Sequence, residues 1–210
     1  LLLVLAFRGR KQIAGAVSSG AGRAVAAVSQ LTDGVTTRGG KFFGEAWDAG
    51  RKIGEIELVR VPSRVAENIY MRRDIGEAFT RMRADAERQG VLLDATSGWR
   101  SHLKQQALWA KAVAAGAARV AAGLTAAFNS LAPAPFNITP LYPLTAYPGT
   151  SNHQDGTAVD IWLHMKIADV LVGKTSDKML ATYTWLRQNA GRYGFRENAK
   201  EKWHWSPTGR

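Results

Sequence analysis

Hydrophobic residues recur at helical spacing after Val61. Ser63 suits an N-cap, and the apolar positions that follow it predict one helix that runs to about Gln89. Gly90 fits the end of that helix, because glycine readily adopts the left-handed conformation found after many helices. The expected buried face consists of Val65, Ile69, Ile75, Ala78, Phe79 and Met82.

Beyond this helix, short apolar runs alternate with longer helical patterns. Five prolines and a glycine in residues 132–150 predict an extended loop. The other predicted elements are strands over 91–96 and 158–163 and helices over 101–127 and 177–191.

Residues 1–60 differ in amino-acid composition from the rest of the chain. They hold ten of the 21 glycines and no proline, and residues 14–40 contain few large apolar side chains. Such a segment buries little surface to offset the entropy of ordering. We therefore expect residues 1–60 to be an arm, linker or partner-docking segment, and residues 61–210 to form the globular domain.

The first residues form an apolar run, Leu1–Phe7, with Arg8, Arg10 and Lys11 directly behind it. A signal peptide does not fit, because its positive charges precede the apolar run. Two interpretations stay open: the end of a membrane anchor, which implies membrane contact, or a short segment that packs on a partner or on the body of the protein. No apolar run reaches the ~18 residues that span a bilayer.

Composition narrows the chemistry. The 28 Lys and Arg against 17 Asp and Glu give a net charge of +11, which favours acidic partners such as nucleic acid, anionic lipid or an anionic cell wall. Basic and aromatic residues do not interleave as in a nucleic-acid-binding surface, so we expect no specific nucleic-acid partner. The absence of cysteine excludes disulfides, thiolate metal ligands and a cysteine nucleophile.

The segment Ser151–Asp160, SNHQDGTAVD, places a histidine and a carboxylate on either side of a turn signal. His153 and Asp160 would lie roughly 23 Å apart on one continuous strand. Asp155-Gly156 between them is a strong signal for a tight turn. Such a turn can bring His153 beside Asp160, which provides two of the three protein ligands of an open zinc site.

Glu201-Lys202-Trp203-His204 supplies the remaining groups of such a site. Glu201 and His204 would share one side of a helical turn, whereas a flat strand would separate them, and a bend could also place both near one ion. His204 offers the third ligand, and Glu201 offers a general base just outside the ligands. The fourth zinc position is left for water, whose pKa zinc lowers toward ~7.

The segment Ser97–Ser101, SGWRS, directly follows the predicted strand 91–96. A glycine turn at a strand end can project Arg100 toward a site, where its planar fork suits a carboxylate or a developing oxyanion. Each of these three segments is weak evidence alone, and the weight lies in their combination.

Together the segments resemble the motifs of the VanY-type zinc D-alanyl-D-alanine carboxypeptidases. These belong to a wider group of peptidoglycan peptidases that includes phage endolysin peptidases. The family pattern is S-G-Y-R-S, Q-x-x-L, S-x-H-x-x-G-x-A-x-D, Y-G-F and E-x-W-H, and the chain follows its order over about residues 63–206. The chain departs from the pattern at Trp99 and Lys202, where Tyr and Pro are usual. The stretch before Ser151 is also longer than usual.

The resemblance implies a role for each matching residue. His153, Asp160 and His204 would bind Zn²⁺, and Glu201 would be the catalytic base and later the proton donor. Arg100 would contact the scissile carbonyl or a substrate carboxylate. Substrate-site positions implied by the resemblance are Gln105, Ser151 and Trp203.

We therefore expect an α+β fold with a small, mostly antiparallel sheet, packed helices and a zinc site on the sheet. The expected function is zinc-dependent hydrolysis of peptidoglycan stem peptides, at the cell envelope, outside the cell or in a virion. Two activities stay open within it: a carboxypeptidase that releases terminal D-Ala and a lytic endopeptidase, with a slight lean toward a virion-associated or exported lytic enzyme. A catalytically silent wall-binding or structural module, in a phage or envelope assembly reached through residues 1–60, is the alternative.

Overall fold

The computed structural model describes residues 34–129, 145–166, 169–170 and 173–210. These fall into two compact units. One joins Gly34–His102 to Gly149–Arg210, and the other contains Leu103–Pro148. Among the described residues, no helix is both long enough and apolar enough to cross a bilayer.

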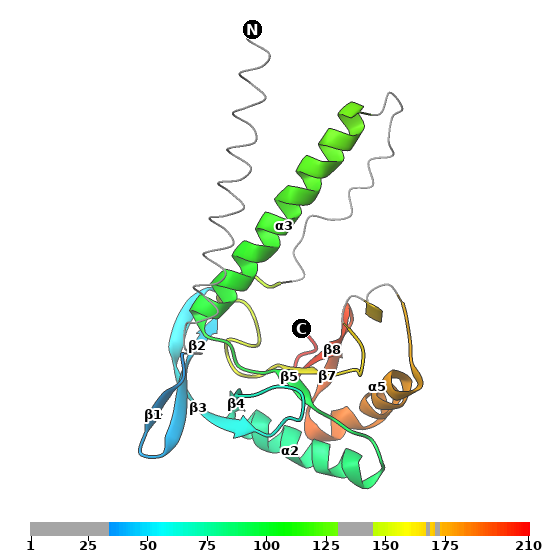
Figure 1. The fold of residues 1–210 in the computed structure, drawn as a ribbon. Helices are drawn as coiled ribbons and strands as arrows, with labels where there is room; N and C mark the ends of the chain where they lie inside the picture. Colours follow the sequence, from blue (N-terminus) through cyan, green and yellow to red (C-terminus); the bar gives the residue numbers. More distant parts are fainter. Residues whose placement is uncertain (1–33, 130–144, 167–168, 171–172) are drawn as a thin grey trace. The chain divides into compact units, whose positions relative to one another are not determined.

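Two small antiparallel sheets form the first unit (Figure 1). One has the order β1-β2-β3-β4, and the other has the order β5-β6-β8-β7. The strands of the first sheet are β1 Thr36–Arg38, β2 Lys41–Asp48, β3 Arg51–Val61 and β4 Ile69–Arg72. Those of the second are β5 Ala95–Ser97, β6 Val159–Ile161, β7 Arg196–Asn198 and β8 Glu201–Ser206. With the helices below, they confirm the expected α+β class.

Helices pack against these sheets. Helix α2 spans Arg73–Arg88, and α5 spans Asp177–Asn189 and leads into the short 3-10 helix η1, Ala190–Tyr193. Ser176 caps α5, because its side chain accepts from the backbone N–H of Met179. The core that joins α2, α5 and the strands includes Phe79, Met82, Leu93, Ile161, Leu186 and Phe195. Helix α3, His102–Asn129, runs mostly through the other unit.

The helix expected from Ser63 begins ten residues later. The hydroxyl of Ser63 does accept from the backbone N–H of Val65 and of Ala66, at 3.2 and 3.3 Å, but it caps only a turn. Residues 69–72 pair with β3 instead, with Ile69 opposite Val61. Sheet pairing here overrides a helical pattern, and Val65 is exposed rather than part of a buried face.

The boundary expected at residue 60 does not divide the described fold. β1, β2 and β3 lie before it, and β3 pairs with β4 beyond it. Two hairpins with two-residue turns build this part, and Gly39-Gly40 and Ala49-Gly50 all have positive φ. Turns of this kind require positive φ, which accounts for several of the glycines before residue 60. Residues 1–33 lie outside the described residues.

Trp99 connects β2 to the Arg100 segment. Its indole N–H donates to the carbonyl of Glu45 at 3.0 Å, and its backbone N–H donates to that of Tyr70 at 2.6 Å. A Cβ added to Gly44 in β2 would lie 2.5 Å from Cζ2 of the indole ring. The ring therefore occupies the space that glycine leaves open in β2.

Gly44→Ala is expected to lower the free energy of unfolding by about 1–3 kcal/mol, because the added methyl overpacks the contact with Trp99. Urea denaturation monitored by circular dichroism measures this change. Gly191→Ala is the control, since nothing lies within 4 Å of that position and no destabilisation is expected. Equal stability of the two variants would show that residues 34–60 do not pack on the rest of the unit.

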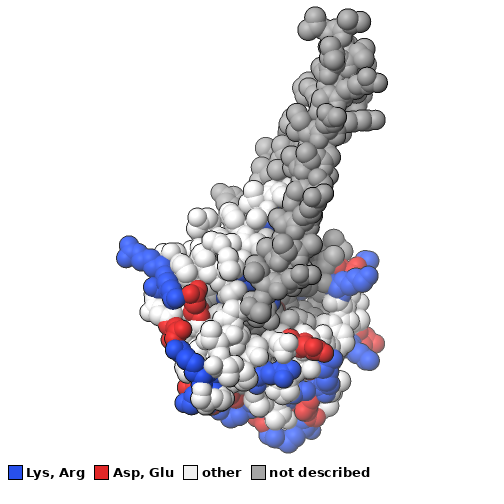
Figure 2. All heavy atoms as spheres, turned by 60° about the vertical axis from the view of Figure 1, so that its left-hand side comes forward, with Lys and Arg blue, Asp and Glu red and all other residues white. Residues whose placement is uncertain are grey.

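Acidic and basic side chains are mixed on the face of the molecule drawn in Figure 2. On the face drawn in Figure 2, Lys and Arg lie among Asp and Glu rather than in one uniform patch. Several of the exposed charges are paired, among them Arg38 with Glu55 and Lys52 with Glu45, both at 2.6 Å. On this face the basic charge would therefore assist approach to a polyanion more than it would form one specific contact.

Candidate metal centre

The turn expected at Asp155-Gly156 is present and reverses the chain between His153 and Asp160. Gly156 has a φ of +74°, and the Asp155 carboxylate accepts from the backbone N–H of Thr157 at 2.9 Å. The backbone N–H of Arg72 donates to the Gly156 carbonyl at 3.1 Å and fixes the turn against β4. His153 is thereby returned to the side of Asp160.

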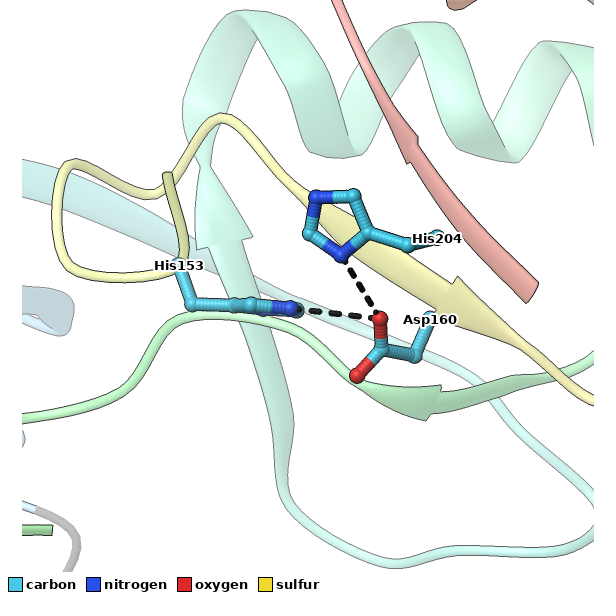
Figure 3. Close-up of side chains that lie close together, drawn as sticks. All are labelled: His153, Asp160 and His204. Atoms are coloured by element: carbon cyan, nitrogen blue, oxygen red, sulfur yellow. Dashed lines mark hydrogen bonds and ion pairs between the residues drawn. The ribbon is translucent and has the colours of Figure 1, made fainter. Parts of the chain in front are cut away.

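Strand pairing brings the third member of the group. Asp160 in β6 lies opposite His204 in β8. In Figure 3 both imidazoles point at the carboxylate of Asp160. Its Oδ1 lies 3.2 Å from His153 Nε2 and 3.0 Å from His204 Nδ1. All three side chains are buried, and their candidate ligand atoms lie within 4.8 Å of one another.

The donor chemistry of this group fits a metal ion. His153 Nδ1 lies 2.6 Å from the carbonyl oxygen of Gly98, which can only accept, so Nδ1 carries the hydrogen. Burial, with the nearby charge of Arg100, lowers the pKa of His153 to about 4, so the ring is neutral at pH 7. Its Nε2 therefore turns a lone pair toward the carboxylate of Asp160. Nε2 of His153 and Oδ1 of Asp160 are thus two acceptors 3.2 Å apart, and a cation bound by both would remove their mutual repulsion.

A hydrogen bond to a backbone oxygen orients His204 as well. Its Nε2 lies 2.7 Å from the carbonyl oxygen of Arg210, so this nitrogen donates, and Nδ1 faces Asp160. Burial opposes protonation of His204, but the hydrogen bond and charge of Asp160, the Arg210 backbone and the charge of Glu201 together outweigh burial and raise the His204 pKa. Burial likewise opposes ionisation of Asp160, yet its contacts with His153, His204 and Arg100 hold the Asp160 pKa well below its ordinary value.

Arg100 lies against the far oxygen of Asp160. Its Nη2 is 2.6 Å from Asp160 Oδ2, and its Nε donates to the hydroxyl of Ser97 at 3.0 Å. The backbone N–H of Arg100 donates to the His153 carbonyl at 2.9 Å, which ties the two segments together. Arg100 thus orients the carboxylate of Asp160.

Glu201 begins β8, the strand that carries His204. The pairing of β7 with β8 is irregular at Glu197 and Asn198, just where Glu201 pairs. Glu201 and His204 thus lie on one strand with an irregular pairing and not on a helical turn. Glu201 is half-buried, and burial raises its pKa, although the nearby His204 opposes the shift. A carboxylate with a raised pKa is suited to accept a proton near neutral pH.

The structure also places the remaining predicted residues. Ser151 is buried, and its hydroxyl accepts from the backbone N–H of His153 at 3.3 Å. Trp203 belongs to the hydrophobic core. Gln105 lies in the other unit, where its amide nitrogen donates to the Ala146 carbonyl at 2.7 Å. Gln105 Oε1 is buried without a hydrogen-bond partner among the described residues.

Two buried amides next to His153 were missed. Gln154 Oε1 accepts from the backbone N–H of Gly149 at 2.6 Å, and its Nε2 lies 3.1 Å from Nδ1 of His102. The His102 ring stacks on Trp47 of β2, with centroids 3.7 Å apart. Asn152 contacts residues 206–210. No sequence signal marks either amide, because most of their partners are distant along the chain.

A close backbone contact with Gly50 holds Gly149, at the start of the loop that carries Ser151 and His153. Its carbonyl accepts from the N–H of Gly50 at 2.8 Å. A Cβ added to Gly149 would lie 2.5 Å from the Cα of Gly50. The turn between β2 and β3 therefore anchors the loop that carries Ser151 and His153.

Several solved structures are similar to this chain. VanYB in complex with D-alanine-D-alanine has 23% identity and a TM-score of 0.51, over 77% of this chain and 83% of that one. A vancomycin-resistance D,D-pentapeptidase, a VanY mutant in complex with Zn(II), has 24% identity and a TM-score of 0.49, over 78% and 82%. The LD-carboxypeptidase LdcB has 26% identity and a TM-score of 0.48, over 71% and 66%. No curated protein matches significantly.

The family itself follows from the sequence match. A family model described as VanY, D-alanyl-D-alanine carboxypeptidase, matches residues 68–210, which is more than half of the chain and contains the whole His153, Asp160 and His204 group. This chain therefore belongs to the VanY family of D-alanyl-D-alanine carboxypeptidases.

Proposed function

We propose that this protein is a zinc-dependent carboxypeptidase that removes the terminal D-Ala from peptidoglycan stem peptides. The convergence of His153, Asp160 and His204 carries the proposal. One ring nitrogen of each histidine donates to a backbone oxygen, so the other nitrogen is left to bind a metal. Two imidazoles and one carboxylate are a typical ligand set for zinc in hydrolytic sites, with one position left open.

The chain's own residues supply the rest of the chemistry. When bound, zinc would act as a Lewis acid that polarises the scissile carbonyl and acidifies the attacking water. The carboxylate of Glu201 would take the proton from that water and deliver it to the leaving amine. Arg100 holds Asp160 through one edge of its guanidinium, and its remaining N–H groups would bind the scissile carbonyl or a substrate carboxylate.

The other substrate-site residues support this scheme unequally. We assign Ser151 and Trp203 a supporting role, because the hydroxyl of Ser151 holds the backbone of His153 and Trp203 packs in the core beside His204. Gln105 stays a proposed substrate contact on the resemblance alone. We place the reaction in the cell envelope or outside the cell, where its substrate lies.

Digestion of purified pentapeptide muropeptides, read by mass spectrometry, tests the proposal. We expect release of free D-Ala, loss of release after a chelator, and recovery with added zinc. Internal cleavage of the stem would instead identify a lytic endopeptidase, the activity of a virion-associated or exported lysin. No cleavage by a folded, zinc-loaded protein would favour a silent wall-binding or structural module, docked through residues 1–60.

A further inference from the structure

The orientation of His204 depends on one backbone carbonyl. Nε2 of His204 lies 2.7 Å from the carbonyl oxygen of Arg210, which accepts its hydrogen and leaves Nδ1 as the nitrogen for a metal. A partner that fixes the far nitrogen of a ligating histidine also fixes the direction of its ring. What holds the Arg210 carbonyl in place therefore bears on the metal site.

Asn152 holds this carbonyl. Its side-chain Nδ2 lies 2.9 Å from the Arg210 carbonyl oxygen, 3.0 Å from Thr208 Oγ1 and 3.3 Å from Ser206 Oγ. The hydroxyl of Ser206 donates to the same carbonyl at 3.1 Å. Asn152 and Ser206 are both buried, so water does not compete for these hydrogen bonds.

The backbone of Asn152 belongs to the loop that carries the other two ligands. Its carbonyl accepts from the N–H groups of Thr157 and Ala158 at 2.9 and 3.1 Å, which closes the chain between His153 and Asp160. One residue thus joins the loop of two ligands to the segment that orients the third.

Gly209 offers a second way to reach the same segment. It has a φ of +70°, and its N–H donates to the Ser206 hydroxyl at 3.0 Å. A Cβ at this position would lie 2.9 Å from the carbonyl oxygen of Glu197. A side chain at residue 209 would therefore displace the turn that brings Arg210 to His204.

We propose that Asn152 is a positioning residue of the metal site, which orients His204 through the backbone carbonyl of Arg210. The inference rests on the proposed function, because it concerns the metal that His204 would bind. It goes further by assigning part of the metal affinity to an amide that binds neither metal nor substrate.

Zinc affinity measured by competition with a chromophoric chelator tests the proposal. Asn152→Ala is expected to bind zinc more weakly than the unaltered chain, by up to the roughly 10- to 100-fold that direct loss of a ligating histidine's partner costs. The visible absorption of the Co²⁺-substituted variant should also change, because it reports ligand geometry. Thermal unfolding without metal, measured in parallel, separates this effect from a general loss of stability.

Gly209→Ala should weaken zinc binding in the same way without altering residue 152, and it decides the matter alone if Asn152→Ala does not fold. Gly173→Ala is its matched control, because Gly173 also has a positive φ, +80°, but nothing lies within 4 Å of its added Cβ. Unchanged zinc affinity and an unchanged Co²⁺ spectrum in both Asn152→Ala and Gly209→Ala would overturn the inference. Failure of the unaltered chain to bind zinc would overturn the proposed function instead.

Discussion

Glu201→Gln is expected to lower kcat for D-Ala release by about 10²- to 10⁴-fold, the range that a positioned general base contributes. The amide keeps the size of the carboxylate but cannot accept a proton from water. Bound zinc and KM should change little, since Glu201 is not among the three candidate ligands. Steady-state release of D-Ala, with metal content measured on the same sample, checks both statements.

Glu197→Gln is the matched control for this experiment. Glu197 is also a half-buried glutamate beside β8, but it pairs with the hydroxyl of Tyr183 on α5. Its replacement should leave kcat unchanged. Comparable turnover by Glu201→Gln and Glu197→Gln would remove Glu201 from the reaction.

Asp160→Ala is expected to abolish both zinc retention and turnover. Oδ1 of Asp160 is the atom on which both histidines converge, and Oδ2 holds Arg100. The substitution removes the charged ligand and also frees the guanidinium, so the loss of zinc affinity should exceed the 10- to 100-fold that substitutions outside the ligands cost. Zinc content after gel filtration and D-Ala release are the two readouts.

A second buried aspartate provides the comparison. Asp94 pairs with Arg64 at 2.8 Å but lies outside the candidate metal group. Asp94→Ala also removes a buried, arginine-paired carboxylate, and it should cost stability while the folded protein still retains zinc. Zinc retention by Asp160→Ala would contradict the ligand assignment, whereas zinc loss in Asp94→Ala would make the Asp160 result a general effect of unfolding.

Part of the metal group could be predicted from the sequence, because the turn that brings His153 to Asp160 is a local feature. Asp155-Gly156 marks a tight turn, and a turn there returns His153 toward Asp160 whatever else the chain does. The approach of His204 depends on the pairing of β6 with β8, which bridges more than 40 positions. That step could be expected from the family resemblance and not from the local pattern.

The first sheet was not predicted, for two physical reasons. Ile69 fits a helical spacing with Ile75 and Phe79, but its backbone groups find partners in β3, and this long-range pairing decides the local structure. The glycines before residue 60 looked like a segment without a core, although several of them form hairpin turns. Propensity describes a short window of sequence, whereas both outcomes depend on residues outside that window.

The surroundings of the candidate metal ligands could not be predicted from the sequence either. Arg100 was expected to face substrate, and its contact with Asp160 spans 60 positions. The carbonyls of Gly98 and Arg210 that orient the two histidines are backbone groups, which leave no trace in residue identity. A motif can therefore name ligands, but the groups that aim them emerge only from the folded chain.

The contact between Gly50 and Gly149 limits how this enzyme can be truncated or fused into a chimera. A fragment that starts where the family match starts, at residue 68, would contain every candidate ligand but would lack the strand turn that anchors the ligand loop. It would also expose the indole of Trp99, which β2 covers. The smallest functional fragment of this enzyme is thus longer than the family match, and a chimera should include strands β1–β3 together with the motifs.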